Sequence, residues 1–488
     1  MDLSPTVSSE PSPGRFIVKT LGCKANAYDG QLIEEALRQE GLQAAREGDS
    51  VQLCIVNSCT VTDEADRQSR KLATRLARDY PGAKIVLTGC GAEVNPELYA
   101  ATAGVDYVVG NSDKARLAML VSEATQGALP AHSVLGRVAG YDEMISRHPM
   151  DREWPLPRES FFAATPADAG RTRAFLKIQE GCNSFCTFCV IPYGRGPARS
   201  LEIKEIVSQV TALVDSGVQE VVISGTNLGD YGMDWPDGRP ELERLFRAIF
   251  GETRLLRLRV GSLDPTEITP GLRQLMKDEP RFCPHFHVSL QSPHSRVLKL
   301  MKRKYGFAEV EACLQSLAKM RAPVGGVFVG VDLITGFPGE SVADFEWTVE
   351  ALRKLPWTRL HVFPYSERQG TPATRLPGIV PMGERNRRAK ILRELSLERL
   401  RAAYQEILVN CLQQGTELSE VLVEGDCKGP NPQQRWTPGY TPNYIRILIP
   451  SSKELPELSL RNQRLRVRPT ELYVDRSAGD VCFIGQWV

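Results

Sequence analysis

The chain lacks an excess of charge of either sign, and it lacks any long apolar run. Its 488 residues include 60 Lys and Arg against 59 Asp and Glu, so the overall charge indicates no particular partner and any nucleic-acid surface must be local. No apolar run is long enough to span a bilayer. The first residues, MDLSPTVSSEPSPGR, also lack the apolar core of a signal peptide, and we expect a disordered leader over residues 1–14. These absences favour a cytoplasmic protein without a membrane partner.

Cysteine is present in an informative pattern. The cytoplasm is reducing, so twelve cysteines favour metal ligands or buried thiols over disulfides. The stretch EGCNSFCTFC places Cys182, Cys186 and Cys189 in a C-x3-C-x2-C pattern. A structural zinc site needs four ligands, and no further Cys or His follows closely. The pattern therefore favours a [4Fe–4S] cluster held by three thiolates, with one iron free to bind a small molecule. A zinc knuckle or three buried thiols are the alternatives.

Three further cysteines end apolar strands in the first part of the chain. The stretches RFIVKTLGC, VQLCIVNSC and AKIVLTGC end at Cys23, Cys59 and Cys90, and the intervals suit one βαβ unit of roughly 30 residues or more. DGQLIEEALRQEG has helical periodicity, and GVDYVVGNSDK adds a fourth strand. Because parallel strands end at one edge of a sheet, residues 15–122 are predicted to form an α/β domain that brings the three cysteines together.

The middle of the chain repeats a strand and helix pattern. Residues 123–170 lose the earlier periodicity and are predicted to be a linker. Six apolar strands follow within residues 171–400, most of them with an amphipathic helix: AFLKIQEG, VQEVVISG, RLLRLRVGS, HFHVSLQS, GVFVGVDLITG and RLHVFPYS. These repeats fit a partial (β/α)6 barrel, whose functional residues should lie at the carboxyl ends of the strands. Cys182 directly follows the first of them.

The last part of the chain predicts a nucleic-acid surface. A charged helix over residues 383–414 is followed by short strands in residues 415–488, which indicate a small β-barrel. Side chains there that could bind phosphates or stack on bases are Arg464, Arg466, Arg468, Tyr440 and Tyr444, although a solvated face is the alternative for any one Arg. Arg195 and Arg199, just past the three-cysteine loop, are stronger candidates for holding RNA.

The C-x3-C-x2-C loop resembles that of radical S-adenosylmethionine (SAM) enzymes. The resemblance implies that SAM chelates the free iron through its amino and carboxylate groups, and that one electron then yields a 5′-deoxyadenosyl radical. It also implies SAM contacts in the cysteine loop and at later strand ends, at Phe188, Gly225, Thr226, Asn227, Ser289, Gln291, Gly336 and Gly339. Ordinary turn chemistry is the alternative explanation for each of these later positions.

The order of domains resembles the methylthiotransferases over about Phe16 to Val488. The segments TLGCKANAYDG, NSCTVTDEADRQSR and KIQEGCNSFCTFCVIPYGRGPARS are most similar to the tRNA N6-threonylcarbamoyladenosine methylthiotransferases. CTVTDEAD is the most branch-specific segment, and GYTPNY fits the same branch in a TRAM-type RNA-binding barrel. Together with the shared sheet edge, the resemblance implies a second [4Fe–4S] cluster at Cys23, Cys59 and Cys90. It also implies tRNA as partner, a flavodoxin-like electron donor, and methylthiolation at C2 of the modified adenosine next to the anticodon.

The chain departs from the family pattern in three segments. GAE follows Cys90, Pro293 follows the LQS motif, and NAYDG stands where NQYES is more typical. One alternative is a sibling enzyme that acts on isopentenyladenosine or on an aspartate of a ribosomal protein. Another is a metal-bearing RNA-binding protein without catalysis. The sequence identifies neither the sulfur donor nor an acid–base residue.

Overall fold

The computed structural model divides the chain into two compact units. One comprises residues 1–165 and 190–197, and the other comprises residues 166–189 and 198–488. The residues it describes are 14–126, 130–135, 172–320, 325–425, 427, 429–431, 433–450, 460–475 and 479–488. Residues 1–13 of the predicted leader over residues 1–14 and most of the predicted linker over 123–170 therefore lie outside the described residues. Each unit has its own hydrophobic core.

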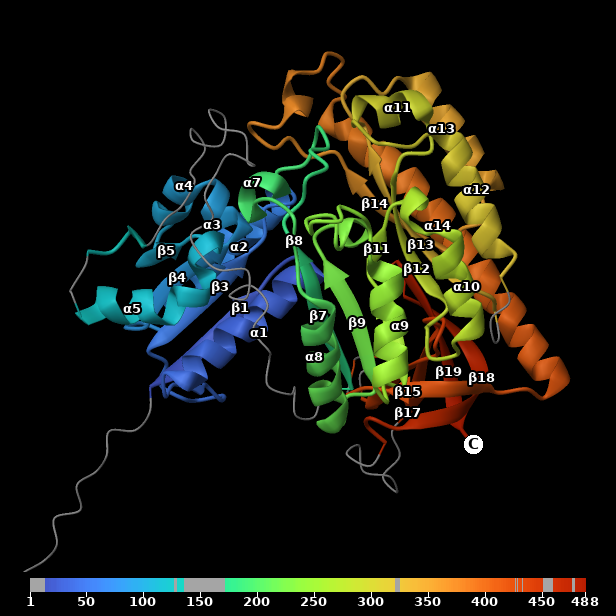
Figure 1. The fold of residues 1–488 in the computed structure, drawn as a ribbon, viewed down its shortest axis with the longest axis horizontal. Helices are drawn as coiled ribbons and strands as arrows, with labels where there is room; N and C mark the ends of the chain where they lie inside the picture. Colours follow the sequence, from blue (N-terminus) through green and yellow to red (C-terminus); the bar gives the residue numbers. More distant parts are fainter. Residues whose placement is uncertain are drawn as a thin grey trace, which may run out of the picture. The chain divides into compact units, whose positions relative to one another are not determined.

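The first unit contains a six-stranded parallel sheet in the order β2-β1-β3-β4-β5-β6 (Figure 1). Alternate residues of β3 and β4 enter two different core clusters, so both faces of the sheet are covered. The strands are β1 (Arg15–Thr20), β2 (Gln43–Ala44), β3 (Leu53–Ser58), β4 (Lys84–Gly89), β5 (Tyr107–Val109) and β6 (Ser133–Leu135). The helices are α1 (Lys24–Gln39), α2 (Asp63–Asp79), α3 (Cys90–Val94), α4 (Pro96–Ala100), η1 (Asn111–Arg116) and α5 (Leu117–Gln126).

The sheet of the first unit extends beyond residue 122, where its predicted domain ended. Strand β6 pairs in parallel with β5, although its residues fall within the segment predicted to be a linker. Three residues are too few to show an alternation of apolar and polar side chains, so this strand carried no periodic signal.

The second unit contains the six predicted parallel strands in two linked sheets, so the predicted partial barrel is confirmed. One sheet has the order β10-β9-β7-β8 and the other β11-β12-β13-β14. The strands are β7 (Arg173–Glu180), β8 (Arg199–Ser200), β9 (Glu220–Gly225), β10 (Arg257–Val260), β11 (Ser262–Leu263), β12 (His285–Gln291), β13 (Phe328–Thr335) and β14 (Arg359–Pro364). The intervening helices are α8 (Ile203–Asp215), α9 (Leu242–Glu252), α10 (Pro270–Asp278), α11 (Ser295–Leu300), α12 (Phe307–Ala318) and α13 (Val342–Lys354).

A long helix leads into a closed five-stranded barrel at the end of the chain. Helix α14 (Met382–Gln414) ends at Gly415, whose φ of 62° suits glycine. The barrel strands, in the order β15-β16-β17-β19-β18, are β15 (Leu418–Val423), β16 (Trp436–Tyr440), β17 (Arg446–Pro450), β19 (Asp480–Trp487) and β18 (Arg464–Asp475). Strand β16 was not expected as a strand, because its Pro and Gly argue against one. Among the described residues, no helix is both long and apolar enough to cross a bilayer.

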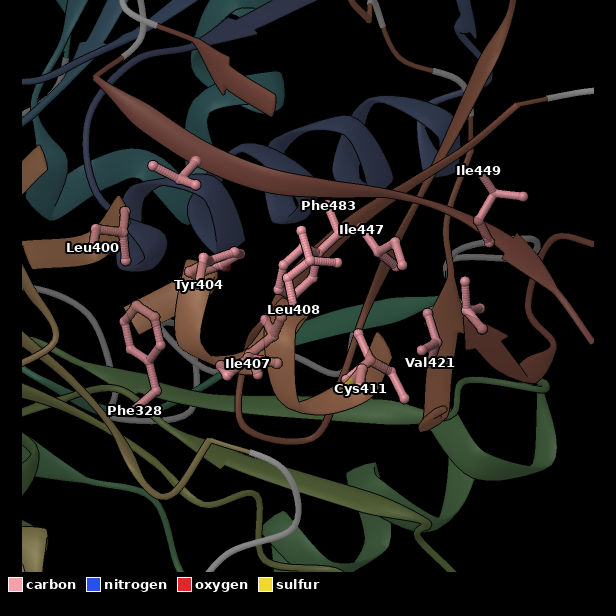
Figure 2. Packing of buried hydrophobic residues seen from close by; sticks show 14 of the residues in the cluster. Phe328, Leu400, Tyr404, Ile407, Leu408, Cys411, Val421, Ile447, Ile449 and Phe483 are labelled. Carbon is pink, nitrogen blue, oxygen red and sulfur yellow. The ribbon is translucent and has the colours of Figure 1, made fainter. Parts of the chain in front are cut away.

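The core of this barrel is shared with the helix that precedes it. Figure 2 shows Tyr404, Ile407 and Leu408 of α14 close to Ile447 and Phe483 of the barrel. The rings of Tyr404 and Phe483 lie 4.8 Å apart between centroids. The apolar side of α14 therefore supplies the buried surface that a small barrel needs to form a stable core.

Two tyrosines of the terminal barrel pack against the amino ends of the partial barrel strands. The rings of Tyr440 and Tyr444 stack at 5.0 Å, with Arg173 lying 4.8 Å from the first ring and Arg259 lying 4.7 Å from the second. Arg259 is itself held by the buried Glu220 at 2.8 Å. The prediction that these two tyrosines stack on RNA bases is therefore wrong, because arginines of the protein occupy their faces.

Candidate active site

The three cysteines of the second unit lie in a tight loop directly after β7. Gly181, with a φ of 75°, turns the chain at the end of the strand, and Phe185 also has a positive φ of 47°. The amide of Cys189 donates to the carbonyl of Cys186 at 3.0 Å. The loop therefore lies at the carboxyl end of the first barrel strand, where functional residues of such barrels are found.

Neighbouring segments hold this loop in place. The amide of Thr187 donates to the carbonyl of Met301 at 3.1 Å, and its hydroxyl donates to the carbonyl of Leu300 at 2.8 Å. The ring of Phe188 packs edge-on against Phe337, with centroids 6.3 Å apart. Polar contacts with the segment at Leu300 and Met301 and an apolar contact with Phe337 thus position the loop.

A buried guanidinium contacts one of the thiols. Arg303 donates from Nη1 to Sγ of Cys186 at 3.1 Å. Its Nη2 forms an ion pair with Asp264 and donates to the carbonyl of Ser289 at 3.2 Å, which also accepts from the hydroxyl of Tyr305 at 2.7 Å. The arrangement places a fixed positive charge and a donor at a sulfur that would bind iron. Nothing in the sequence distinguished Arg303 from the lysines beside it.

The loop after β9 is tied to the cysteine loop through Asn227. Its side-chain amide donates to Ser184 Oγ at 3.2 Å and to Asp230 at 2.7 Å, while its backbone amide donates to Gln179 Oε1 at 2.8 Å. The buried hydroxyl of Thr226 has no hydrogen-bond partner among the described residues. An orphaned polar atom beside the cysteine loop fits a polar ligand such as the amino group of SAM.

Other predicted SAM contacts also lie at strand ends, but local geometry already accounts for the glycines. Gln291 ends β12 with a φ of 63°, after a break in the β12–β13 register. Gly336, with a φ of 69°, follows β13, and a Cβ there would lie 2.4 Å from Arg385. A Cβ at Gly225 would lie 2.9 Å from Leu228. The turn-chemistry alternative therefore explains Gly225 and Gly336 without a ligand.

The first unit brings its three cysteines to one edge of the sheet. Cys23 follows β1, Cys59 follows β3 and Cys90 begins α3 after β4, and these three strands are neighbours. A Cβ on Gly22 would lie 2.7 Å from Sγ of Cys59, so glycine permits the close approach of these two loops. Burial, with smaller contributions from the nearby Cys90 and Cys23, raises the pKa of the Cys59 thiol to about 12. Metal binding at Cys59 must therefore release a proton.

A buried ion-pair network lies behind this edge and includes Arg195. The guanidinium of Arg195 donates to Asp29 at 3.0 Å and to Asn26 Oδ1 at 3.2 Å, and Lys114 donates to the same Asp29 carboxylate at 2.9 Å. Asn26 in turn donates to the carbonyl of Ser58, next to Cys59, at 3.1 Å. The prediction that Arg195 holds RNA is wrong, because only 2% of its side chain is exposed.

We expect the Arg195→Ala variant to lower the free energy of unfolding of the first unit by about 3 kcal/mol. This is the lower end of the loss for breaking a buried ion pair, because Lys114 still pairs with Asp29. Urea denaturation followed by circular dichroism measures the change. The exposed Arg75→Ala in the same unit is the control and should shift stability by less than about 0.5 kcal/mol. Equal effects of the two variants would contradict the prediction.

The donor atoms at both candidate sites are cysteine thiols. Within the described part of the chain, no three His, Cys, Asp or Glu side chains are arranged to hold one metal ion. A cubane binds each thiolate through a different iron, so its cysteines surround the cluster instead of converging on one point. All twelve cysteines are free thiols. Three thiols at the end of one strand and three at one sheet edge are therefore available as ligands.

Family profiles match both units. The profile described as Radical SAM superfamily matches residues 176–352, and the one described as Uncharacterized protein family UPF0004 matches residues 15–110. In the solved structure of the radical SAM methyltransferase TsrM from Kitasatospora setae, the fold is similar with a TM-score of 0.52 and 16% identity, over 74% of this chain and 77% of that one. The fold, the cysteine loop and the first profile define a radical SAM enzyme.

Curated relatives match most of the chain. Threonylcarbamoyladenosine tRNA methylthiotransferase MtaB of Aquifex aeolicus is 35% identical over 90% of this chain and 98% of its own length. The protein of the same name from Bacillus subtilis is 32% identical over 89% and 90%. The tRNA-2-methylthio-N(6)-dimethylallyladenosine synthase of Novosphingobium aromaticivorans is 31% identical over 88% and 90%. The chain belongs to the radical SAM tRNA methylthiotransferase family. Its cofactors are SAM and [4Fe–4S] iron–sulfur clusters, as predicted.

We expect the Arg303→Gln variant to bind iron normally but to shift the midpoint potential of the cluster predicted at Cys182, Cys186 and Cys189 to a more negative value. The reason is that a positive charge and a hydrogen bond at a cluster sulfur both favour the reduced form. A redox titration followed by electron paramagnetic resonance measures the potential. Lys302→Gln removes the same charge one residue away, from an exposed side chain, and serves as the matched control. An unchanged potential in Arg303→Gln would contradict the role given to this contact.

Proposed function

We propose that this enzyme converts N6-threonylcarbamoyladenosine next to the anticodon of tRNA to its 2-methylthio derivative. The observation that carries the proposal is the 35% identity to an enzyme named for that substrate, over nearly the full length of both chains. The branch-specific segment CTVTDEAD supports it. Its Thr62 caps α2 by accepting from Ala65, and its Asp66 accepts from the hydroxyl of Tyr99 at 2.7 Å beside the cysteine edge. The residues of this segment therefore form part of the surroundings of Cys59.

We assign two [4Fe–4S] clusters to the six cysteines. Cys182, Cys186 and Cys189 hold the cluster that leaves an iron for SAM, and the second cluster is held by Cys23, Cys59 and Cys90. When bound, the first cluster and SAM supply the one-electron chemistry that an unactivated aromatic C–H bond requires. The protein's own part is positioning. Arg303 fixes Cys186 electrostatically, and residues 185–188 are held by backbone contacts on both sides.

The strand ends around the first loop are assigned to SAM. The hydroxyl of Thr226 and the amide of Asn227 supply polar groups near the cysteines, and the ring of Phe188 supplies an apolar surface beside Phe337. The complete set of proposed SAM-binding residues is Phe188, Gly225, Thr226, Asn227, Ser289, Gln291 and Gly336. The rings of Phe188 and Phe337 reduce the access of water on that side, which protects reactive species from side reactions.

The terminal barrel, residues 415–488, is proposed to be a TRAM-like module that contacts tRNA. Arg464, Arg466 and Arg468 are all exposed along β18, as expected from their spacing. Arg464 pairs with Glu420 at 2.6 Å and Arg468 with Glu417 at 3.0 Å, which supports the solvated-face alternative for these two. In the described residues, Arg466 has no ion-pair partner, so it is the strongest phosphate-binding candidate of the three. A flavodoxin-like electron donor and a cytoplasmic location complete the proposal.

Mass spectrometry of tRNA nucleosides tests the proposed reaction. The chain is expressed in a bacterial strain that lacks its own threonylcarbamoyladenosine methylthiotransferase, and the tRNA is digested to nucleosides. We expect 2-methylthio-N6-threonylcarbamoyladenosine to appear, and the Cys186→Ala variant to give none. Absence of this product from an iron-loaded protein would overturn the substrate assignment.

The same samples separate the alternatives. Appearance of 2-methylthio-isopentenyladenosine instead would move the enzyme to the branch of the Novosphingobium relative, which is nearly as similar at 31% identity. Methylthiolation of a ribosomal-protein aspartate, read from tryptic peptides of the same cells, would assign the third branch. A protein that binds zinc and no iron would support the non-enzymatic reading.

A further inference from the structure

A cavity of about 810 Å³ opens beside the carboxyl ends of β9 and β10 in the second unit. Its walls come from α9, α10, the turn η5 (Pro265–Glu267), the segment that includes η4 (Leu228–Asp230), and the loop at Lys304. Helices α9 and α10 pack against each other, as can be followed in Figure 1. Its volume lies in the range of roughly 300–1,000 Å³ that ligand pockets occupy.

The rim of this cavity is basic, and its floor is partly apolar. Arg239, Arg244, Arg247 and Lys304 are exposed and form the rim, whereas the buried Leu242 and Leu272 form the floor. The exposed Met233 and Pro240 also line the cavity. The side chains of Arg239 and Arg244 are 67% and 70% exposed, and both pair with Glu241. In the part of the chain that the structure describes, Arg247 and Lys304 have no ion-pair partner. The rim therefore presents more cationic than anionic groups to solvent.

The acidic side chains of the walls are engaged by the protein itself. Asp230 accepts from Asn227 at 2.7 Å, and Glu243 accepts from the hydroxyl of Thr269. Glu267 accepts from the amide of Asp264 at 2.7 Å, and burial together with that neighbouring carboxyl raises the pKa of Glu267 well above its ordinary value. A carboxyl biased towards its neutral form adds little negative charge, so the cavity keeps its basic character.

The cavity adjoins the cysteine loop within the same unit. Asp230 in its wall is linked through Asn227 to Ser184, which lies between Cys182 and Cys186. Lys304 on its rim follows Arg303, whose guanidinium contacts Cys186 at 3.1 Å. A ligand in the cavity is therefore held next to the place where the reaction occurs.

We propose that this cavity binds a nucleotide of the tRNA anticodon loop that flanks the modified adenosine. The base lies against the apolar floor, and the phosphate lies at Arg244, Arg247 and Lys304. Single-stranded loops are recognised through splayed bases in such pockets, and cations on the rim suit the adjoining phosphates. The proposal rests on the proposed function, because that function makes tRNA the substrate. Its consequence is that the pocket selects the sequence context of the target adenosine.

The decisive experiment measures RNA affinity at several salt concentrations by fluorescence anisotropy. The probe is an anticodon stem-loop carrying N6-threonylcarbamoyladenosine, and the protein is the full chain loaded with iron. The test variant is Arg244→Gln with Arg247→Gln. We expect weaker binding, with the slope of log affinity against log salt reduced by up to about 0.7, since each neutralised phosphate on a single strand contributes about 0.7.

The matched control removes two cations from the same helical region outside the cavity. Arg254 follows α9 with a side chain 89% exposed, and Lys277 is exposed on α10. The Arg254→Gln, Lys277→Gln double variant should retain the slope of the unaltered protein. If the test and control variants bind RNA alike, the pocket assignment is overturned.

Photocrosslinking provides a second, independent readout. A benzoylphenylalanine placed at Met233, whose side chain is exposed, should crosslink to the anticodon loop within a nucleotide or two of the target. Crosslinks confined to another part of the tRNA would overturn the proposal. The two failures can be distinguished. If the proposed function is wrong, the unaltered protein gives no methylthio product. If only the pocket assignment is wrong, the unaltered protein still gives that product, and the test and control variants have equal salt slopes.

Discussion

Loss of SAM cleavage is the expected result of replacing Cys186 with alanine. Cys186 is buried in the loop after β7 and is the thiol that Arg303 contacts. Without a thiolate there, the cluster of the second unit cannot be held, and SAM has no electron source. Bound iron should fall from about eight to about four per chain, because each cubane holds four irons. Formation of 5′-deoxyadenosine under reducing conditions should fall by more than about a hundredfold, since even lesser changes around metal ligands cost up to that much.

The control for this variant is Cys313→Ala. Cys313 is a buried thiol of α12 that lies outside the loop, so its removal tests for general damage to the unit. We expect its iron content and SAM cleavage to match those of the unaltered protein. Persistence of SAM cleavage in Cys186→Ala would show that the radical site has been assigned to the wrong cysteines.

Replacing Cys59 with alanine should separate the two halves of the reaction. The loop at Cys182 lies in the other unit and remains intact, so SAM cleavage continues. The first unit loses one of three thiols at its sheet edge, and the methylthio product should fall by more than about a hundredfold. The ratio of methylthio nucleoside to 5′-deoxyadenosine, measured by mass spectrometry in one sample, reports this uncoupling directly.

The same strand supplies a control for this second variant. Cys54 lies in β3, five positions before Cys59, and is fully buried in the core of the first unit. Cys54→Ala removes a thiol without removing a sheet-edge ligand, so product and ratio should both stay near their original values. An undiminished product from Cys59→Ala would argue against the second cluster at this edge.

Much of the fold and most of the candidate ligands could be predicted from sequence, because the signals are local. Each of the six barrel strands is an apolar run bounded by turn residues, and each appears in the structure. The three cysteines of the first unit follow strands that proved to be neighbours, β1, β3 and β4. The rule that parallel strands end at one sheet edge was therefore enough to bring Cys23, Cys59 and Cys90 to that edge.

The errors came from residues whose surroundings are supplied by distant segments. Arg195 follows the cysteine loop and has the appearance of an RNA contact, yet Asp29, 166 positions away, binds it in the buried core of the first unit. Tyr440 and Tyr444 have the composition of a stacking platform, but Arg173 and Arg259 cover their rings. Strand β16 forms despite its Pro and Gly because the closing barrel supplies β17 as a partner.

The sequence by itself determined the candidate ligands of this protein and their spacing. The tertiary structure decided the electrostatic surroundings of those ligands. Ligand type and spacing reside in short segments, so the loop around Cys182 and the strand ends around Cys59 were visible without a fold. The contact of Arg303 with Cys186 spans 117 positions, and the basic rim at Lys304 is assembled from segments that follow two different strands, β9 and β12. Charge acts through space with a strength set by distance and burial, and neither quantity can be read from the order of residues.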